Sequence, residues 1–215
     1  MIKHHPNPSL LLAFTQGQLA ASLSIAISTH MDHCQTCRHQ VLALQETSAQ
    51  CLDIDNAELE EWDNDEMIAA ITDDDFEVHP KQSLPIQLNI KGTDYTLPQA
   101  LQSVGLSSWL KLGKLARARI DLNEGEVHTN LLHIEKGGTI PLHTHKGFEL
   151  TVLLAGKFND EHGEYVPGDF IWLNDTNTHS PTTETGCLCL TVANDSMHFV
   201  QGLSKALNPI GKLIY

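Results

Sequence analysis

The chain has 215 residues, enough for one large domain or two modest ones, and its hydrophobic content of 41% is ordinary for a globular protein. Its formal net charge of -14 is concentrated near the start. Residues 1–80 hold 14 acidic and 2 basic side chains, whereas residues 81–215 hold 13 and 11. Such a surface repels nucleic acid and membrane phosphates and attracts a basic protein, although acidic patches also serve solubility alone.

The location of the protein is suggested by what the sequence lacks. No apolar run approaches the roughly 18 residues of a membrane helix, and the start has neither the charged nor the apolar region of a signal peptide. Five cysteines is an odd number, which suits a reducing compartment better than a disulfide framework. We therefore expect a cytoplasmic protein that binds neither membrane nor nucleic acid.

Three short helices are predicted over the first 46 residues. The first follows Ser9, a suitable N-cap, and weakens at Gly17. The second covers residues 19–29, and the third runs from about residue 34 to residue 46. Helices of about 12 residues are marginal in water on their own. A helical domain of this size therefore needs a further constraint, such as a bound metal.

The junction of the second and third helices carries His30, Cys34 and Cys37, spaced four and three residues apart. On a continuous helix this spacing projects one imidazole and two thiols from the same face. Structural zinc takes four nitrogen or sulfur ligands, so these residues would supply three of the four. A redox pair, or two buried thiols, is the alternative interpretation.

The fourth ligand has several candidates: His4, His5, His33, His39 and Cys51. His33 and His39 point about 100 to 200° away from the ligand face of a helix. A first helix that packs antiparallel would bring the amino terminus back over that face, where His4 and His5 compete for the position. We prefer His5.

A fourth helix is predicted from Asn56, a possible N-cap, to about residue 69. Its acidic side covers residues 58–66, and its apolar side includes Met67 and Ile68. The apolar side either completes a helical bundle or lies in a groove of a partner. Asp and Pro clusters over residues 72–85 predict a linker, so we expect one domain over residues 1–85 and a second over residues 86–215.

In the second predicted domain, hydrophobic residues alternate with a period of two, as in strands, and not with the period of 3.6 residues typical of helices. Strand-like segments cover residues 95–97, 109–112, 115–120, 127–134 and 149–154, and turn signals occur at residues 123–125, 137–138, 163 and 167–169. Closely spaced strands with glycine-rich turns predict an antiparallel all-β barrel or sandwich.

A second ligand set lies in this domain. Residues 143, 145 and 149 share parity, so a strand that is regular or only gently broken at Gly147 directs His143, His145 and Glu149 to one face. The pattern Gly-x5-His-x-His-x3-Glu-x6-Gly over residues 137–156 resembles the first motif of the cupins, which are jelly-roll barrels. His179 stands where the second cupin motif places its histidine, although Asn174 and Thr176 replace the usual Pro and Gly. Zinc, iron, manganese and nickel all accept such ligands.

Cys187 and Cys189 lie two apart in a predicted strand and so share a face. They are either small apolar fillers of a barrel wall or oxidisable thiols beside the metal site.

The motifs together resemble one family. The His pair at residues 4–5, the Leu-rich helix that leads into Gln-Gly-Gln-Leu, and His30-x3-Cys34-x2-Cys37 are similar to the zinc-binding anti-sigma domain of bacterial extracytoplasmic-function sigma systems. The cupin-like motifs narrow the resemblance to the ChrR type, in which that domain is fused to a cupin. The resemblance covers nearly the whole chain, and only residues 47–110 match loosely.

This resemblance implies a small all-α helical bundle, bound to zinc, followed by an all-β cupin barrel. It implies a negative regulator of transcription, not an enzyme, whose first domain binds and inhibits a sigma factor. The cupin, with zinc or another divalent metal, would sense singlet oxygen or organic peroxide and release the sigma factor. The alternative is a metal-dependent cupin dioxygenase with a helical docking domain, although such an enzyme does not need the amino-terminal half.

Overall fold

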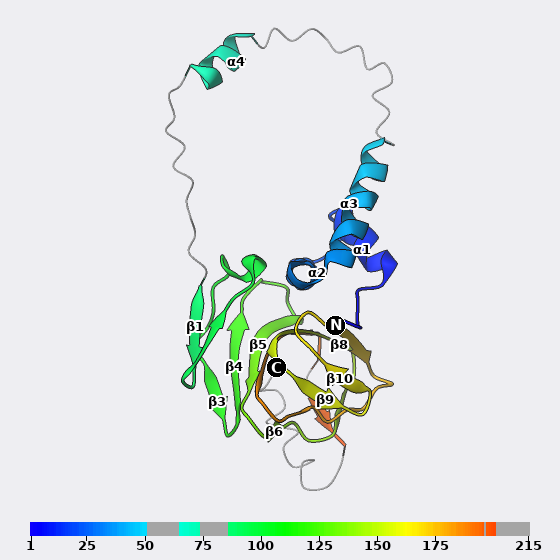
Figure 1. The fold of residues 1–215 in the computed structure, drawn as a ribbon, viewed down its shortest axis with the longest axis vertical. Coiled ribbons are helices and arrows are strands. Elements are labelled where there is room, and N and C mark those ends of the chain that lie inside the picture. The colour runs from blue at the N-terminus through cyan, green and yellow to red at the C-terminus, as the bar shows by residue number, and fades with distance from the viewer. Residues whose placement is uncertain (51–64, 74–85, 196, 201–215) are drawn as a thin grey trace.

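The computed structural model describes residues 1–50, 65–73, 86–195 and 197–200. Three helices come first: α1 (Pro8–Thr15), α2 (Ala21–His33) and α3 (Gln35–Gln50). Figure 1 shows them beside one end of the β-rich part, where the amino terminus also lies. The predicted linker and most of the predicted fourth helix fall outside the described residues, so the boundary near residue 85 stays a prediction.

The β-rich part consists of antiparallel sheets. Its described strands are β1 (Gln87–Ile90), β2 (Thr93–Thr96), β3 (Leu110–Leu112), β4 (Leu115–Ile120), β5 (His128–Ile134), β6 (Gly138–Thr139), β7 (His143–His145), β8 (Phe148–Gly156), β9 (Phe158–Asp160), β10 (Gly163–Tyr165), β11 (Phe170–Asn174), β12 (Thr182–Thr183), β13 (Cys187–Ala193) and β14 (Met197–Phe199). The largest sheet has the order β11-β8-β13-β5-β4-β3, and a smaller sheet has the order β10-β9-β12-β6. Two further pairs, β1-β2 and β14-β7, complete the set.

The two larger sheets pack through a shared apolar cluster, which includes Leu132 and Leu153 from one and Phe158 and Tyr165 from the other. They remain separate sheets in the described chain, so of the expected antiparallel barrel or sandwich the structure shows two packed sheets and not a closed barrel. The physical reason lies in the short strands: β6 and β12 have two residues each, too few to carry a hydrogen-bond ladder around a barrel.

Two local expectations about the helices also need correction. Helix α1 is capped by Asn7, not by Ser9, because the Asn7 side chain accepts a hydrogen bond from the Leu10 amide at 2.8 Å. Pro8 occupies the first turn, where its missing N–H costs nothing. The expected continuous helix through His30, Cys34 and Cys37 is interrupted at Cys34, whose φ of -113° and ψ of 99° are extended.

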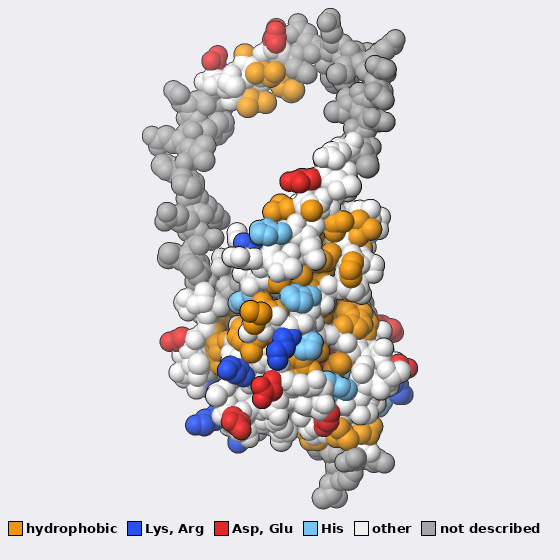
Figure 2. All heavy atoms as spheres, turned by 45° about the vertical axis from the view of Figure 1, so that its right-hand side comes forward, with side chains coloured by type: hydrophobic (Ala, Val, Ile, Leu, Met, Phe, Trp, Pro, Cys, Tyr) orange, Lys and Arg blue, Asp and Glu red, His pale blue; other side chains and the backbone are white. Residues whose placement is uncertain are grey.

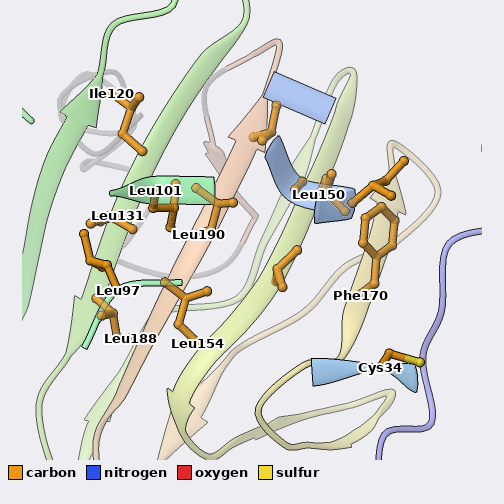
Figure 3. Close-up of a cluster of buried hydrophobic side chains, with 14 of the residues drawn as sticks. Cys34, Leu97, Leu101, Ile120, Leu131, Leu150, Leu154, Phe170, Leu188 and Leu190 are labelled. Atoms are coloured by element: carbon orange, nitrogen blue, oxygen red, sulfur yellow. The ribbon is translucent and has the colours of Figure 1, made fainter. Parts of the chain in front are cut away.

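Helix α2 lies on the outer face of the six-stranded sheet, in contact with β8, β13 and the 3-10 turn η1 (Gln99–Leu101). Ala26 and Ile27 are fully buried and belong to the same apolar cluster as the sheet residues Leu150 and Leu190. Figure 3 shows sheet residues of this cluster together with Cys34. The helices and the sheets therefore share one hydrophobic core, and an independent helical bundle is not established.

Polar contacts fix both ends of α2 against the β-rich part. The Glu124 carboxylate accepts a hydrogen bond from the Ser22 amide at 3.0 Å, which satisfies a donor that the N-terminal end of a helix leaves open. At the other end, Asp32 accepts from the Gln99 amide at 3.1 Å. These contacts set the position and direction of the helix.

Helix α4 (Asp65–Thr72) has no buried residue. Figure 1 shows it apart from the sheets, between two segments outside the described residues. Within the parts of the chain that are described, no helix combines the length and apolar character required to cross a bilayer.

Candidate metal centres

The first centre, here called the His/Cys cluster, consists of His5, His30, Cys34 and Cys37. Their potential ligand atoms all lie within 4.8 Å of one another. His5 Nδ1 is 3.4 Å from Cys34 Sγ and 3.5 Å from Cys37 Sγ. Tetrahedral zinc with bonds of about 2.0 Å to nitrogen and 2.3 Å to sulfur separates such ligands by about 3.5 Å. The four residues therefore form a set that is able to hold a metal ion.

The interruption at Cys34 is what brings this cluster together. His30 lies in the last turn of α2 and Cys37 in the first turn of α3, with Cys34 between the two helices. The ligand atoms converge because the chain bends there, not because they share one helical face. The structure brings the residues singled out by their spacing together, for a partly different reason than the spacing suggested.

His5 reaches the cluster because residues 3–5 lie along the loop that joins β10 to β11. The Lys3 and His4 amides donate to Asp169 Oδ1 at 2.7 and 3.0 Å, and the Phe170 amide donates to the His4 carbonyl at 3.0 Å. The His4 ring lies against Tyr165 instead, with the ring centroids 5.0 Å apart. Of the remaining candidates, His33 and His39 are outside the cluster, and Cys51 lies outside the described residues.

His30 has the hydrogen bonding expected of a ligand. Its Nδ1 lies 2.6 Å from the Gly168 carbonyl, which only accepts, so Nδ1 carries the proton. Its Nε2 is buried without a hydrogen-bond partner in the described structure. Burial lowers the pKa of His30 below its ordinary value, so the imidazole is neutral. An unpaired lone pair in a buried site is costly, and a cation would satisfy it.

The thiols fit the same interpretation. Burial and the hydrogen bond with Cys34 raise the pKa of Cys37 to about 12. Without a cation this thiol stays protonated at neutral pH, whereas a bound metal favours the thiolate.

The second centre, here called the His/Glu cluster, consists of His143 and His145 from β7, Glu149 from β8 and His179 from the loop after β11. All four are buried, and their potential ligand atoms lie within 4.8 Å of one another. Glu149 Oε2 is 3.0 Å from His145 Nε2 and 3.4 Å from His179 Nε2. The alternation rule applied to His143, His145 and Glu149 thus predicted that they converge. The rule assumed one strand, whereas His143 and His145 lie in β7 and Glu149 lies in β8, in a different sheet.

Two features of the backbone hold this cluster. His143 and His179 exchange backbone hydrogen bonds of 3.1 and 3.0 Å, which fixes the loop after β11 against β7. The chain turns at Gly147 between β7 and β8, where a Cβ atom would lie 1.9 Å from Asn194 Oδ1. That oxygen accepts a hydrogen bond from the Phe148 amide at 2.8 Å, so a larger residue at position 147 would displace the Asn194 side chain and break this bond.

The members of the His/Glu cluster differ in their pKa shifts and therefore in their charge. Burial and the neighbouring His179 lower the pKa of His143 to about 3, so this ring is neutral. Burial alone would raise the pKa of Glu149, but His145 and His179 outweigh it and hold that pKa well below its ordinary value. Burial alone would lower the pKa of His179, but Asp160 and Glu149 raise it to about 9. An anionic carboxylate among imidazoles is a suitable set for a divalent cation.

Asp160 orients His179 and was not predicted from the sequence. Its Oδ2 lies 3.1 Å from His179 Nδ1, while its Oδ1 accepts from the His162 amide at 2.8 Å and from the Tyr165 hydroxyl at 3.1 Å. A carboxylate on the outer nitrogen of a ligand histidine fixes the tautomer and turns Nε2 toward the metal. The turn at Gly163 was predicted, but nothing in the sequence placed it beside His179.

Cys187 and Cys189 are both fully or nearly fully buried. The hydrogen bond between them, together with burial, raises the pKa of Cys189 well above its ordinary value. Cys189 also lines a cavity of about 30 Å³ together with His143, Glu149 and His179. A thiol therefore lies at the His/Glu cluster, as the second interpretation of these cysteines requires.

Comparison with known proteins agrees with the resemblance seen in the motifs. Residues 101–196 match the model of the ChrR cupin-like domain. The anti-sigma-E factor ChrR of Cereibacter sphaeroides is 28% identical over 215 residues, which cover 99% of this chain and 99% of that protein. The crystal structure of Rhodobacter sphaeroides SigE in complex with the anti-sigma ChrR matches with a TM-score of 0.65 at 24% identity, over 90% of this chain and 99% of that chain.

The last match shows a shared fold, and the other two extend the likeness to the sequence. The resemblance predicted from the motifs is therefore confirmed: this chain is similar along its length to an anti-sigma factor of the ChrR type, and residues 101–196 match the ChrR cupin-like domain.

Proposed function

We propose that the protein is an anti-sigma factor that binds and inhibits an extracytoplasmic-function sigma factor and releases it on an oxidative signal. The observation that carries this proposal is the similarity to an anti-sigma factor over 99% of the chain. In this proposal residues 1–85 bind the sigma factor and residues 86–215 are the sensor.

The metal of the His/Cys cluster is proposed to be zinc. Two thiols and two imidazoles at tetrahedral separations suit zinc, whereas oxygen ligands suit magnesium or calcium. Three short helices gain rigidity from such a cross-link. His5, His30, Cys34 and Cys37 are its proposed ligands.

Helix α4 supports a role in binding a protein. Its apolar side chains Met67, Ile68 and Ile71 are 59%, 54% and 68% exposed, and Asp65 and Glu66 lie in its first turn. Figure 2 shows hydrophobic side chains gathered on one side of this helix. An apolar stripe bordered by carboxylates fits a groove with a basic rim, such as a surface that normally faces DNA or polymerase.

The His/Glu cluster is proposed to hold zinc or another divalent metal and to receive the signal. A cavity of about 30 Å³ has room for one or two water-sized molecules, which favours a small oxidant such as singlet oxygen or the head of an organic peroxide. Cys187 and Cys189 are proposed to be oxidisable at this site. Release of a mostly bound sigma factor requires about 5 kcal/mol of differential affinity. Disruption of a metal centre is large enough to supply it.

The test is capture of the sigma factor by the tagged full chain. The variant Cys34→Ala plus Cys37→Ala should recover much less sigma factor than the wild type does. Cys187→Ala plus Cys189→Ala is the matched control, because it also removes two buried thiols but leaves the His/Cys cluster intact. Equal recovery by wild type and both variants would remove the His/Cys metal from the proposal.

A metal-dependent dioxygenase is the second candidate, since three histidines and a glutamate also suit a redox metal. The small cavity argues against it, because pockets for organic substrates usually measure about 300 Å³ or more.

A further inference from the structure

An unbroken series of contacts joins the two metal centres. It begins at His179 of the His/Glu cluster, whose Nδ1 lies 3.1 Å from Asp160 Oδ2. The other oxygen of Asp160 accepts a hydrogen bond from the Tyr165 hydroxyl at 3.1 Å. Tyr165 is 1% exposed and its ring lies against that of His4, next to His5 of the His/Cys cluster. Each member of this series therefore has little freedom to move alone.

Tyr165 also begins the loop that holds the His/Cys cluster, residues 165–170. Asp169 is fully buried, and its Oδ1 accepts from the Lys3 and His4 amides. Its Oδ2 accepts from the Val166 amide at 2.8 Å, which ties the two ends of the loop together. One carboxylate thus fixes both the loop and the segment that presents His5.

A second ligand depends on the same loop. The Gly168 carbonyl accepts from His30 Nδ1 at 2.6 Å and thereby sets the direction of Nε2. Two of the four residues of the His/Cys cluster, His5 and His30, are therefore oriented by residues 165–170. The other two, Cys34 and Cys37, are positioned by the helices.

We propose that Asp160, Tyr165 and Asp169 are positioning residues through which the His/Glu cluster sets the geometry of the His/Cys cluster. This inference deepens the proposed function, on which its biological meaning rests, because it gives the sensor a physical route to the zinc site. A change in how His179 is held moves Asp160, then Tyr165 and the loop, and so displaces His5 and His30 relative to the two thiols. Loss of tetrahedral geometry weakens the site.

The packing of the loop makes this transmission effective. A Cβ atom at Gly168 would lie 2.5 Å from Ile2 Cδ1 and 2.7 Å from His33 Cβ, so the loop packs closely against both the amino terminus and α2. Two other polar links between the helices and the β-rich part in the described chain, Glu124 to Ser22 and Asp32 to Gln99, involve no member of either cluster. Residues 165–170 thus form a polar connection that reaches candidate ligands of both clusters.

The experiment follows Co²⁺ bound to the full chain. Cys51 and Cys189 are replaced by alanine in every chain, because Cys189 lines the cavity at the His/Glu cluster. The thiolate-to-cobalt charge-transfer band then reports the His/Cys cluster. The rate at which a chelator removes this band is measured in the wild type, His145→Ala, Tyr165→Phe and the double variant. We expect His145→Ala to change the rate by about 5- to 150-fold, the usual range of coupling between sites. In the Tyr165→Phe background the change should fall below about twofold.

Tyr95→Phe is the matched control, because Tyr95 likewise bonds a buried histidine, His133, through its hydroxyl at 3.1 Å but lies outside this series. Its background should retain the full response to His145→Ala, and Asp160→Asn should abolish the response as Tyr165→Phe does. If His145→Ala fails to fold, Glu149→Gln replaces it. An equal response in the wild-type and Tyr165→Phe backgrounds, or no response in the wild type, overturns the proposal.

Sigma capture by the same variants separates this inference from the proposed function. A chain that captures sigma but shows no coupling leaves the anti-sigma assignment standing and removes the route. A chain that shows the coupling but captures no sigma removes the assignment alone.

Discussion

Gly168→Ala is the most direct test of how the helices sit on the β-rich part. Gly168 has a φ of +95°, which disfavours any residue with a Cβ atom by about 1 to 2 kcal/mol. The new methyl group would also overlap Ile2 and His33, at 2.5 and 2.7 Å, and such overpacking costs about 1 to 3 kcal/mol. We expect the free energy of unfolding to fall by about 2 to 5 kcal/mol.

Gly113→Ala separates the two contributions. Gly113 has a φ of +57°, and a Cβ atom there would have no neighbour within 4 Å. It should cost only the backbone strain of about 1 to 2 kcal/mol. The difference between the variants, about 1 to 3 kcal/mol, measures the contact of the loop with the amino terminus and α2.

The assays are urea unfolding and competition for Zn²⁺ with a chelator of known affinity. Because Gly168 orients His30 and borders the segment that holds His5, the overlap should also weaken zinc binding, by up to about 150-fold if 3 kcal/mol is lost at the site. Gly113→Ala should bind zinc as the wild type does. Equal zinc affinity and equal stability of the two variants would refute the contact of Gly168 with Ile2 and His33.

Four further predictions follow from the structure. Met67→Asp plus Ile71→Asp should reduce sigma capture at least tenfold, about 1.4 kcal/mol, yet leave the urea midpoint unchanged, since both side chains are exposed; an unchanged capture would exclude α4 from the interface. Residues 1–85 alone should still capture sigma but no longer respond to oxidant, and a fragment without any capture would place the binding surface elsewhere. Metal analysis should find two divalent metals per chain, and an oxygen electrode should record no oxygen uptake. One redox metal, with oxygen uptake on a small substrate, would favour the dioxygenase. Burial lowers the pKa of His133, so the unfolded chain binds the extra proton and the free energy of unfolding falls as pH drops below about 6.5; His133→Phe should make this fall shallower in urea unfolding, and identical pH profiles would contradict this.

The clustering of these candidate ligands could be predicted because most of their spacing is local. His30, Cys34 and Cys37 lie within eight residues, and a parity rule over seven residues identified His143, His145 and Glu149. Such rules tolerate errors in local structure. The interruption at Cys34 and the division of the second motif between β7 and β8 changed the reason for convergence but not the residues that converge.

Features that depend on long-range packing could not be predicted. Asp160 and His179 are 19 residues apart, and Asp169 contacts amides about 165 residues away in the chain. No periodicity relates such positions. A pattern of alternating strands also does not reveal whether the sheets close, because closure depends on the hydrogen bonds at the ends of strands as short as β6 and β12.

Because the helices share a hydrophobic core with the sheets, a fragment that holds only the predicted first domain would lose part of its packing. A fragment of residues 1–85 would expose Ala26 and Ile27, now fully buried, at a cost of about 2 to 4 kcal/mol, and would lose the contacts of His5 and His30 with the loop. Structural zinc in small domains supplies about 10 to 16 kcal/mol, which exceeds that loss. The fragment should therefore fold when zinc is present and unfold when it is chelated, whereas in the full chain the sheets still hold α2 after chelation. Dependence on the metal, and not the ability to fold, is then what distinguishes the isolated helices from the same helices packed on the sensor.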